Sequence, residues 1–306
     1  TNLIEIKPIT SCNLNCIFCS VDEGKDTKKT SDVVVEKTYL IEEFKKLAKN
    51  KDTKGKPLYA CINVHGEPFL YNPLTELIKE LKQIENVNAS IITNGTLITE
   101  DDIDRLKEAG LDRINISLNA FSDENTKKLA GTYYNLEKVK GIIEYAVQKL
   151  EVVVAPLYLK GLNDEDMPEI IRFCTSLRRK YNTKFPLIGM QNFLSYKRGR
   201  NPTKQAPWDE FEKKMKEWEK ETKTELKDDI FYDIIKTNKL EKPFKKGDII
   251  EATISFPDRY RNQMIAVSKD MKRTISVLDC NLKEGRKVNI KIIRDKHNIF
   301  VGSISK

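Results

Sequence analysis

The sequence predicts an α/β fold, a partial (β/α)6 TIM-like barrel followed by a small all-β barrel. Three observations carry this prediction. Apolar, β-rich runs alternate with helical patterns through the first two-thirds of the chain. Helical periodicity ends near Phe244, and short strand-like runs replace it. The 306 residues are 39% hydrophobic and 33% charged, which suits folded domains with a real core.

Six strand-like runs define the first part. They lie at 3–9, 59–64, 90–93, 113–118, 152–159 and 186–193. Between them, apolar residues recur at helical spacing, as in Leu40, Phe44 and Leu47. Thr99 opens a T-E-D-D helix start, and Gly110 is the matching stop signal. Strands separated by helices indicate parallel βα units, so we expect a partial barrel; the pattern alone also permits a doubly wound open sheet.

The pattern predicts three domains or segments. Residues 1–197 form the partial barrel, 198–240 a basic and helical linker, and 241–306 a small antiparallel barrel of five strands. The linker opens on the turn-rich stretch YKRGRNP and continues into a helix. Trp208, Phe211, Met215 and Trp218 form one stripe on that helix, which we interpret as packing.

We expect a cytoplasmic protein with no membrane partner. No apolar run approaches the roughly 18–20 residues that span a bilayer. The first residues include Glu5 and Lys7 and form no long apolar block, unlike a signal peptide. In a reducing compartment, clustered cysteines bind metal more often than they form disulfides.

Cys12, Cys16 and Cys19 lie within eight residues of one another, after the first predicted strand. Zinc usually takes four ligands from two separated pairs, and no second pair is present. The remaining cysteines, Cys61, Cys174 and Cys280, are isolated, and we expect Cys61 and Cys174 to be core residues. Three thiolates suit a [4Fe–4S] cluster with one iron left for another ligand.

The stretch CNLNCIFC matches C-x₃-C-x₂-C, with the aromatic Phe18 before the last cysteine. In this the sequence resembles the radical S-adenosylmethionine (SAM) superfamily. The resemblance implies a [4Fe–4S] cluster on the three cysteines and SAM chelated at the open iron. It also implies an electron donor such as ferredoxin or flavodoxin. One electron cleaves SAM to a 5′-deoxyadenosyl radical, which abstracts hydrogen from the substrate.

Further landmarks appear in the order of that superfamily over residues 3–193. The stretch NVHGEP resembles its G-G-E-P element, so Gly66 would approach SAM and Glu67 would accept from the SAM ammonium. ITNGTL places Asn94 at the same site. INISLNA places Ser117 and Asn119 near the ribose or methionine part of SAM.

Each landmark has a plainer reading taken alone. Asn94 would be a turn residue, and Asn163 with Asp164 would begin the helix after the fifth strand. His65 replaces the first glycine of the G-G-E-P element. It serves either as a substrate contact or proton donor, or as a space-filling residue at a strand end.

Basic charge concentrates in the tail. Residues 241–306 hold +7 of the formal net charge of +8. KKGDIIEATI and EGRKVNIKII resemble a TRAM domain, a small OB-like barrel often fused to RNA-modifying enzymes. RNA, either tRNA or rRNA, is the predicted partner, and Tyr260 or Phe256 would stack on its bases. The candidate phosphate contacts are Arg198, Arg200, Arg259, Arg261, Lys272, Arg273, Arg286 and Lys287.

The leading hypothesis is a radical SAM enzyme that modifies an RNA nucleotide. A second is a radical SAM enzyme acting on a peptide or small metabolite, with the tail as a packing module. A third is a non-catalytic iron–sulfur protein that binds RNA; Glu67 and Asn94 argue against it, because a pure binder needs no SAM pocket.

Overall fold

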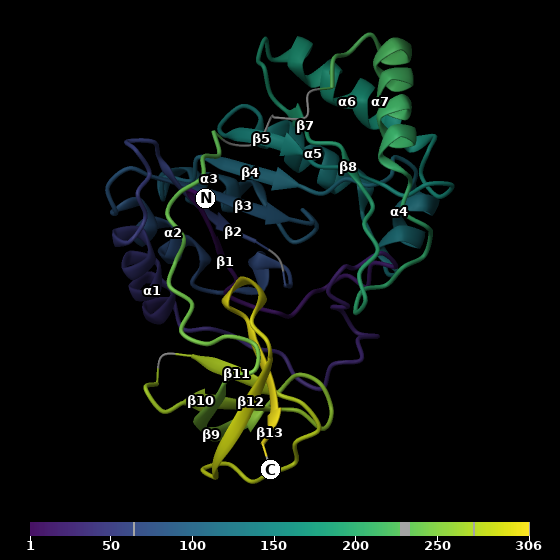
Figure 1. The fold of residues 1–306 in the computed structure, drawn as a ribbon. Helices are drawn as coiled ribbons and strands as arrows, with labels where there is room; N and C mark the ends of the chain where they lie inside the picture. Colours follow the sequence, from purple (N-terminus) through teal and green to yellow (C-terminus); the bar gives the residue numbers. More distant parts are fainter. Residues whose placement is uncertain (64, 227–232, 272, 306) are drawn as a thin grey trace. The chain divides into compact units, whose positions relative to one another are not determined.

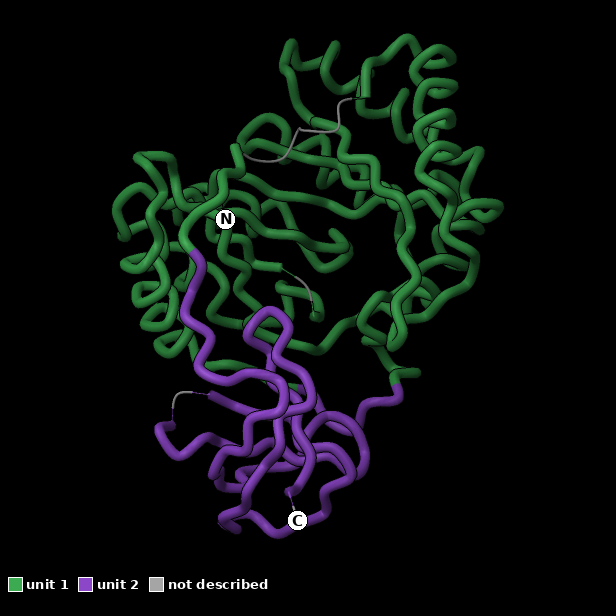
Figure 2. Tube along the Cα trace, viewed as in Figure 1, with its two compact units in different colours: residues 1–27, 33–238 green, residues 28–32, 239–306 purple. Residues whose placement is uncertain are grey.

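The chain folds into two compact units (Figure 2). The computed structural model describes residues 1–63, 65–226, 233–271 and 273–305. The first unit comprises residues 1–27 and 33–238, and the second comprises 28–32 and 239–306. The segment 28–32 therefore belongs to the same unit as the C-terminal barrel, although it follows directly on the cysteine-rich stretch.

A six-stranded parallel sheet forms the centre of the first unit (Figure 1). Its strands lie side by side in chain order: β1 (Leu3–Ile6), β2 (Leu58–Ile62), β3 (Val87–Thr93), β4 (Arg113–Ile116), β5 (Glu151–Val154) and β7 (Leu187–Ile188). A doubly wound sheet reverses its strand order at a switch point, and this sheet does not. The partial barrel is therefore confirmed, and the doubly wound alternative is wrong.

Helices with apolar faces lie around the outside of this sheet (Figure 1). They are α1 (Lys37–Lys49), α2 (Leu74–Lys82), α3 (Glu100–Glu108), α4 (Asp123–Ala130), α5 (Leu136–Ala146), α6 (Asp166–Lys180) and the short helix η1 (Pro68–Leu70). Leu77, Ile103 and Ile143 bury the helix faces against sheet residues such as Ile91 and Ile114, in one core. The predicted start of α3 is confirmed, because Thr99 and Asp102 form a reciprocal capping box.

The fifth and sixth strand-like runs are each interrupted. The fifth run forms β5 and then β6 (Leu157–Tyr158), and the sixth run forms β7 and then β8 (Gln191–Asn192). The short strands β6 and β8 pair with each other in a separate two-stranded sheet. The helix α7 (Trp208–Thr222) belongs to the first unit. The predicted stripe packs at Phe211, Met215 and Trp218, and the rings of Phe211 and Trp218 lie 5.9 and 5.2 Å from that of the buried Tyr158. The prediction is wrong for Trp208, which is 56% exposed at the start of the helix.

The C-terminal barrel contains the five predicted strands. They are β9 (Ile249–Pro257), β10 (Met264–Ser268), β11 (Thr274–Val277), β12 (Lys287–Arg294) and β13 (Phe300–Ile304), and they close in the order β10-β11-β13-β12-β9. The expectation of a wholly antiparallel barrel is wrong, because β11 and β13 pair in parallel. The connection through β12 and the short helix η2 (Lys296–Asn298) returns the chain beside β11 in the same direction.

The segment 28–32 is fixed to the barrel by Arg259. The Thr30 amide donates to the Arg259 carbonyl at 2.8 Å, and the Arg259 guanidinium donates to the Ser31 carbonyl at 2.9 Å and to Asp32 at 3.0 Å. Lys29 lies 6.0 Å from the ring centre of Tyr260. The second unit is therefore built from two separated stretches of chain.

Within the described residues, no helix has both the length and the apolar character needed to cross a bilayer.

Candidate functional site

The predicted site residues of the first unit meet at the carboxyl ends of its parallel strands. The cysteine loop, residues 10–27, follows β1, Glu67 follows β2, Asn94 follows β3, and Ser117 follows β4. The Glu67 amide donates to the Ser11 carbonyl at 2.8 Å, and the Ser117 amide donates to the Thr93 carbonyl at 2.9 Å. Barrels of this kind perform their chemistry at this end, where the loops converge.

The three clustered cysteines are free thiols, each partly exposed. The Glu23 amide donates to Cys19 Sγ at 3.2 Å, which places a backbone dipole on that sulfur. Burial raises the pKa of the Cys12 thiol to about 11 and that of Cys16 to about 12. A bound cation is what would keep such thiols ionised near neutral pH.

These thiols are not arranged for one metal ion. Among the described residues, no group of three or more His, Cys, Asp or Glu side chains is placed to hold a single ion. In an iron–sulfur cube each cysteine binds a different iron atom. Three free cysteines on one loop match a cluster in the chemistry of their donor atoms.

Arg200 lies about 180 residues after the cysteine loop in the chain, and its side chain holds that loop in place. Its guanidinium donates to Asp22 at 2.7 Å, to Asn15 Oδ1 at 2.8 Å and to the carbonyls of Glu23 and Cys16 at 3.0 and 3.1 Å. The side chains of Arg200 and Asp22 are 18% and 9% exposed. This predicted RNA contact therefore lies among the residues that shape the cysteine loop.

Glu67 is buried and connects three segments. Its Oε1 accepts from the Thr93 hydroxyl at 2.6 Å and from the Phe69 amide at 3.2 Å, while Oε2 accepts from the Asn94 amide at 2.9 Å. Burial raises the pKa of Glu67 to about 7, against the lowering effect of these hydrogen bonds. The carboxyl group is thus oriented by donors on both oxygens.

Asn94 joins the turn after β3 to the cysteine loop. Its side-chain amide donates to Asn13 Oδ1 at 2.9 Å, and Asn13 donates back to the Thr96 hydroxyl at 2.8 Å. Asn94 Oδ1 accepts from the Thr96 amide at 3.0 Å. The sequence reasoning missed Asn13, whose only signal is its place directly after Cys12.

Gly66 and Gly131 allow close backbone approach to the cysteine loop. A Cβ at Gly66 would lie 2.2 Å from the Ser11 carbonyl oxygen, and one at Gly131 would lie 2.2 Å from that of Asn15. No side chain fits at such distances. The structure thus explains the need for glycine at position 66 by the close passage of the cysteine loop, whereas the sequence analysis predicted an approach to SAM.

Three other predicted residues have packing partners. Phe18 packs against the small buried cluster that contains Leu129 and Phe193. Asn119 Oδ1 accepts from the Leu157 amide at 2.8 Å, which connects the end of β4 to β6. Ser117 is half-buried directly after β4.

His65 lies beside the cysteine loop. Its Nδ1 is 3.9 Å from Glu23 Oε1, and its side chain is 36% exposed while that of Glu23 is 3% exposed. The isolated cysteines lie elsewhere: Cys61, Cys174 and Cys280 are buried, the last in the barrel core. The expectation of core positions for Cys61 and Cys174 is confirmed.

The predicted RNA contacts of the second unit differ in exposure. Arg259 is 13% exposed at its side chain and is used to hold residues 28–32. Arg273 is partly buried. The exposed ones in the second unit are Arg261, Arg286 and Lys287, while Arg198 is exposed in the first unit. Phe256 is 46% exposed on β9. Lys272 lies outside the described residues.

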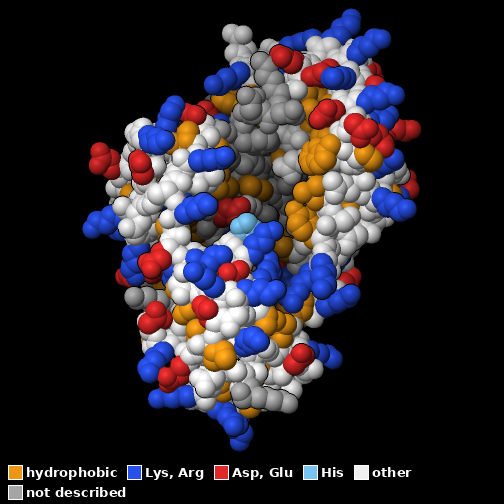
Figure 3. Space-filling model, in the orientation of Figure 1, with side chains coloured by type: hydrophobic (Ala, Val, Ile, Leu, Met, Phe, Trp, Pro, Cys, Tyr) orange, Lys and Arg blue, Asp and Glu red, His pale blue; other side chains and the backbone are white. Residues whose placement is uncertain are grey.

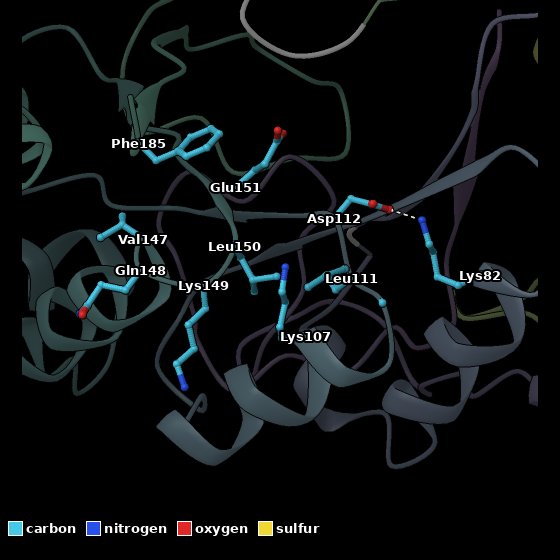
Figure 4. A pocket seen from close by; sticks show the side chains of 11 residues that line it. Lys82, Lys107, Leu111, Asp112, Val147, Gln148, Lys149, Leu150, Glu151 and Phe185 are labelled. Atoms are coloured by element: carbon cyan, nitrogen blue, oxygen red, sulfur yellow. Dashed lines mark hydrogen bonds and ion pairs between the residues drawn. The ribbon is translucent and has the colours of Figure 1, made fainter. Parts of the chain in front are cut away.

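The opposite end of the sheet carries a cavity of about 650 Å³ (Figure 4). Its lining comes from segments that precede β3, β4 and β5, and includes Lys82, Asp112, Lys149 and Glu151. Lys82 Nζ lies 2.7 Å from Asp112 Oδ2, as the dashed line in Figure 4 shows. The lining residues lie at the amino ends of the strands, so none of the predicted cofactor contacts reaches this cavity.

The space-filling view shows a hollow in the molecular surface (Figure 3). Apolar side chains lie along its walls, and acidic side chains appear at its depth. Apolar walls with a few converging polar groups are typical of a ligand site.

Comparison with known proteins gives one family. The sequence matches the radical SAM superfamily over residues 6–174. An uncharacterized protein of Methanocaldococcus jannaschii is 35% identical over 332 residues, covering 99% of this chain and 75% of that protein. A probable GTP 3′,8-cyclase of Methanococcus aeolicus is 34% identical over 171 residues, 53% of this chain and 52% of that protein. The chain thus spans about half the length of the cyclase.

Solved structures show the same fold. SuiB of Streptococcus suis bound to the precursor peptide SuiA aligns with a TM-score of 0.58 at 16% identity, covering 73% of this chain and 47% of that one. TYW1 with a lysine–pyruvate adduct aligns with a TM-score of 0.50 at 19% identity, covering 72% and 73%. At these identities the likeness concerns the fold alone.

Proposed function

The chain belongs to the radical SAM superfamily, and we propose that it is the enzyme by which an RNA nucleotide is modified through reductive cleavage of SAM. The cofactors of this superfamily are a [4Fe–4S] cluster and SAM, and its enzymes need an electron donor. The observation that carries the proposal is the convergence of a free three-cysteine loop and the buried Glu67 at the carboxyl ends of one parallel sheet.

The residues present fit these cofactors. Cys12, Cys16 and Cys19 are unpaired thiols on one loop, and Cys19 Sγ already accepts a backbone N–H. Holding a three-cysteine cluster is the role we assign to them. When bound, the cluster and SAM supply one-electron reductive cleavage, which begins radical chemistry on the substrate. We infer ferredoxin or flavodoxin as the electron donor.

The role of the chain's own residues is to position the cofactors and to enclose the site that holds them. Arg200 and Asp22 fix the path of the cysteine loop, and the Asn13–Asn94 pair ties that loop to the turn after β3. Glu67 presents a carboxyl group held by three donors, suited to accept from the ammonium of SAM. Gly66 follows β2, Ser117 and Asn119 follow β4, and Phe18 lies on the cysteine loop. These four residues remain our candidate cofactor contacts.

Cleavage of SAM is tested with the full chain reconstituted anaerobically. With dithionite and SAM, we expect release of 5′-deoxyadenosine, and Cys16→Ala should abolish it together with the cluster absorption. The matched control is Cys174→Ala, in a helix core away from the loop. Continued production of 5′-deoxyadenosine by Cys16→Ala would defeat the proposed mechanism.

RNA as substrate is supported by the second unit. Its strand order, with β11 beside β13 and β12 beside β9, is that of a five-stranded barrel in which the face of the second and third strands and two loops bind oligonucleotides. Here those loops are 258–263 and 295–299. Arg261 is exposed in the first of them, and most of the chain's excess positive charge lies in this unit.

RNA binding is tested with point variants. We expect Arg261→Gln to weaken binding of tRNA or rRNA and to lower the salt-dependence slope by about one. Lys45→Gln, an exposed change on α1, serves as the charge-matched control. Nucleoside mass spectrometry of a deletion strain should then reveal one missing modification. Equal salt slopes for both variants, with a complete nucleoside set, would favour a peptide or small-molecule substrate instead.

A further inference from the structure

Tyr134 carries a buried polar atom that the proposed residue roles leave unused. It lies in the connection between α4 and α5, and the residue is only 6% exposed. Among the described residues, its hydroxyl has no hydrogen-bond partner. A buried hydroxyl without a partner costs free energy, so such a group in a folded protein usually indicates a bound partner.

This connection lies against the cysteine loop. The amides of Asn15 and Ile17 donate to the carbonyls of Ala130 and Leu129, at 2.9 and 3.0 Å. The cysteine loop is thereby attached to the end of α4, on both sides of Cys16. Tyr134 follows four residues after Ala130, in the same buried core against which Cys12 and Cys16 pack.

The other end of the connection meets the turn after β3. Lys138 Nζ donates to the Thr96 carbonyl at 2.7 Å, and a Cβ at Gly95 would lie 3.2 Å from Val139. Residues 131–135 therefore run between the cysteine loop and the turn that holds Glu67. Tyr134 belongs to this connection, and it is buried.

Two acidic groups act on the Tyr134 hydroxyl. Burial, and then the charges of Cys16 and Glu67, raise the pKa of Tyr134 above its ordinary value. The hydroxyl therefore stays protonated and acts as a donor. Glu67 already accepts three hydrogen bonds, whereas the residues on both sides of Cys16 bond the end of α4 that leads into residues 131–135.

We propose that the Tyr134 hydroxyl donates a hydrogen bond to the sulfur of Cys16 when that thiolate holds the cluster. The inference rests on the proposed function and adds a positioning residue to it. Hydrogen bonds to cluster sulfurs are one of the means by which proteins set cluster reduction potentials. A donor at this sulfur stabilises the reduced, more negative cluster, so Tyr134 would make reduction easier.

The test is the midpoint potential of the reconstituted full chain, followed by EPR. Tyr134→Phe should shift the potential to more negative values at unchanged iron content. Tyr145→Phe is the matched control, because its hydroxyl bonds Asp104 on the α3–α5 side, and it should leave the potential unmoved. An unmoved potential in Tyr134→Phe overturns the proposal, as does weaker SAM binding without a potential shift, which would make SAM the partner.

If Tyr134→Phe fails to fold or to take up iron, a second replacement tests the same proposal. Site-specific 3-fluorotyrosine at position 134 keeps the ring and makes the hydroxyl a stronger donor, so the potential should become more positive. An unmoved potential there also overturns the proposal. Wild-type chain that forms no cluster or yields no 5′-deoxyadenosine would instead defeat the proposed function, so the two failures are distinguishable.

Discussion

The two ends of the parallel sheet are built in different ways. At the amino ends, a cavity of about 650 Å³ is lined by residues that lie close to their own strands, with Lys82 and Asp112 paired across it. At the carboxyl ends, Arg200 contacts a loop about 180 residues earlier in the chain, and Glu67 bonds Thr93 and Asn94. This cavity therefore lies at the end of the sheet where the contacts are simpler.

This difference shows that the presence of a cavity does not by itself identify the end that carries the candidate site. The amino-end pair is partly exposed, at 25% and 38%, and such pairs contribute little to stability. At the carboxyl ends, Glu67 and Thr93 are buried, and hydrogen bonds connect four segments, which is the arrangement that fixes side chains for chemistry. Substitutions at the two ends should therefore differ in size and in kind.

The largest effect is expected for Arg200→Met. It removes the ion pair with Asp22, whose side chain is 9% exposed, and the hydrogen bonds to Asn15, Cys16 and Glu23. We expect a loss of about 3 kcal/mol in the free energy of unfolding, with lower iron uptake. Urea unfolding and iron analysis measure both. Arg198→Met, two residues away and exposed, is the control; equal losses in the two variants would contradict the role of Arg200.

The second largest effect is expected for Glu67→Gln. A glutamine amide cannot accept at both oxygen positions, so its NH₂ group faces either the Asn94 amide or the donors at Oε1. We expect the free energy of unfolding to fall by about 1–3 kcal/mol, and SAM binding to weaken. Denaturant unfolding and equilibrium dialysis test this. The same change at Glu108, exposed at the end of α3, should alter neither; wild-type behaviour of Glu67→Gln would remove Glu67 from the site.

Asp102→Ala should have a smaller, pH-dependent effect. Burial disfavours the charged carboxyl, but hydrogen bonds from Thr99 and Arg105 outweigh it and lower the pKa of Asp102 below 3.8. Because the folded-state pKa is the lower one, the stabilisation is complete above the unfolded value and is lost as pH falls through the folded value. We expect a cost of about 1 kcal/mol at pH 7 that shrinks below about pH 4. Unfolding curves across pH measure it, and a constant difference down to pH 2 would refute the assignment.

The smallest effect is expected at the amino end. Lys82→Met removes the ion pair with Asp112 and a hydrogen bond to the Val87 carbonyl. We expect less than about 1 kcal/mol of destabilisation and unchanged release of 5′-deoxyadenosine per cluster. Loss of cleavage beyond the loss of stability would give this cavity a function and break the comparison between the two ends.

The sequence predicted the parts of the fold that depend on periodicity. The alternation of strand and helix patterns anticipated the parallel sheet, and Thr99 with Asp102 anticipated the start of α3. The parallel pairing of β11 with β13 was missed, because five short strands in a row suggest hairpins and give no sign of which strands close the barrel.

The candidate site was predictable where its residues form local motifs. The cysteine spacing and the HGEP and TNG stretches are visible in a few residues of sequence. Arg200 was interpreted as a nucleic-acid contact, since a cation in a basic, turn-rich stretch shows nothing of a partner far away in the chain. Tyr134 gave no signal, because one aromatic residue between two helices is ordinary until its hydroxyl is seen to be buried.

The attachment of residues 28–32 to Arg259 has a consequence for the order of assembly during synthesis. The ribosome makes this segment immediately after the cysteine loop and before the barrel strands. Until the barrel strands have been made, the segment has no docking surface, and one end of the cysteine loop is untethered. We therefore expect iron–sulfur assembly factors to load chains that contain the folded barrel in preference to shorter nascent chains.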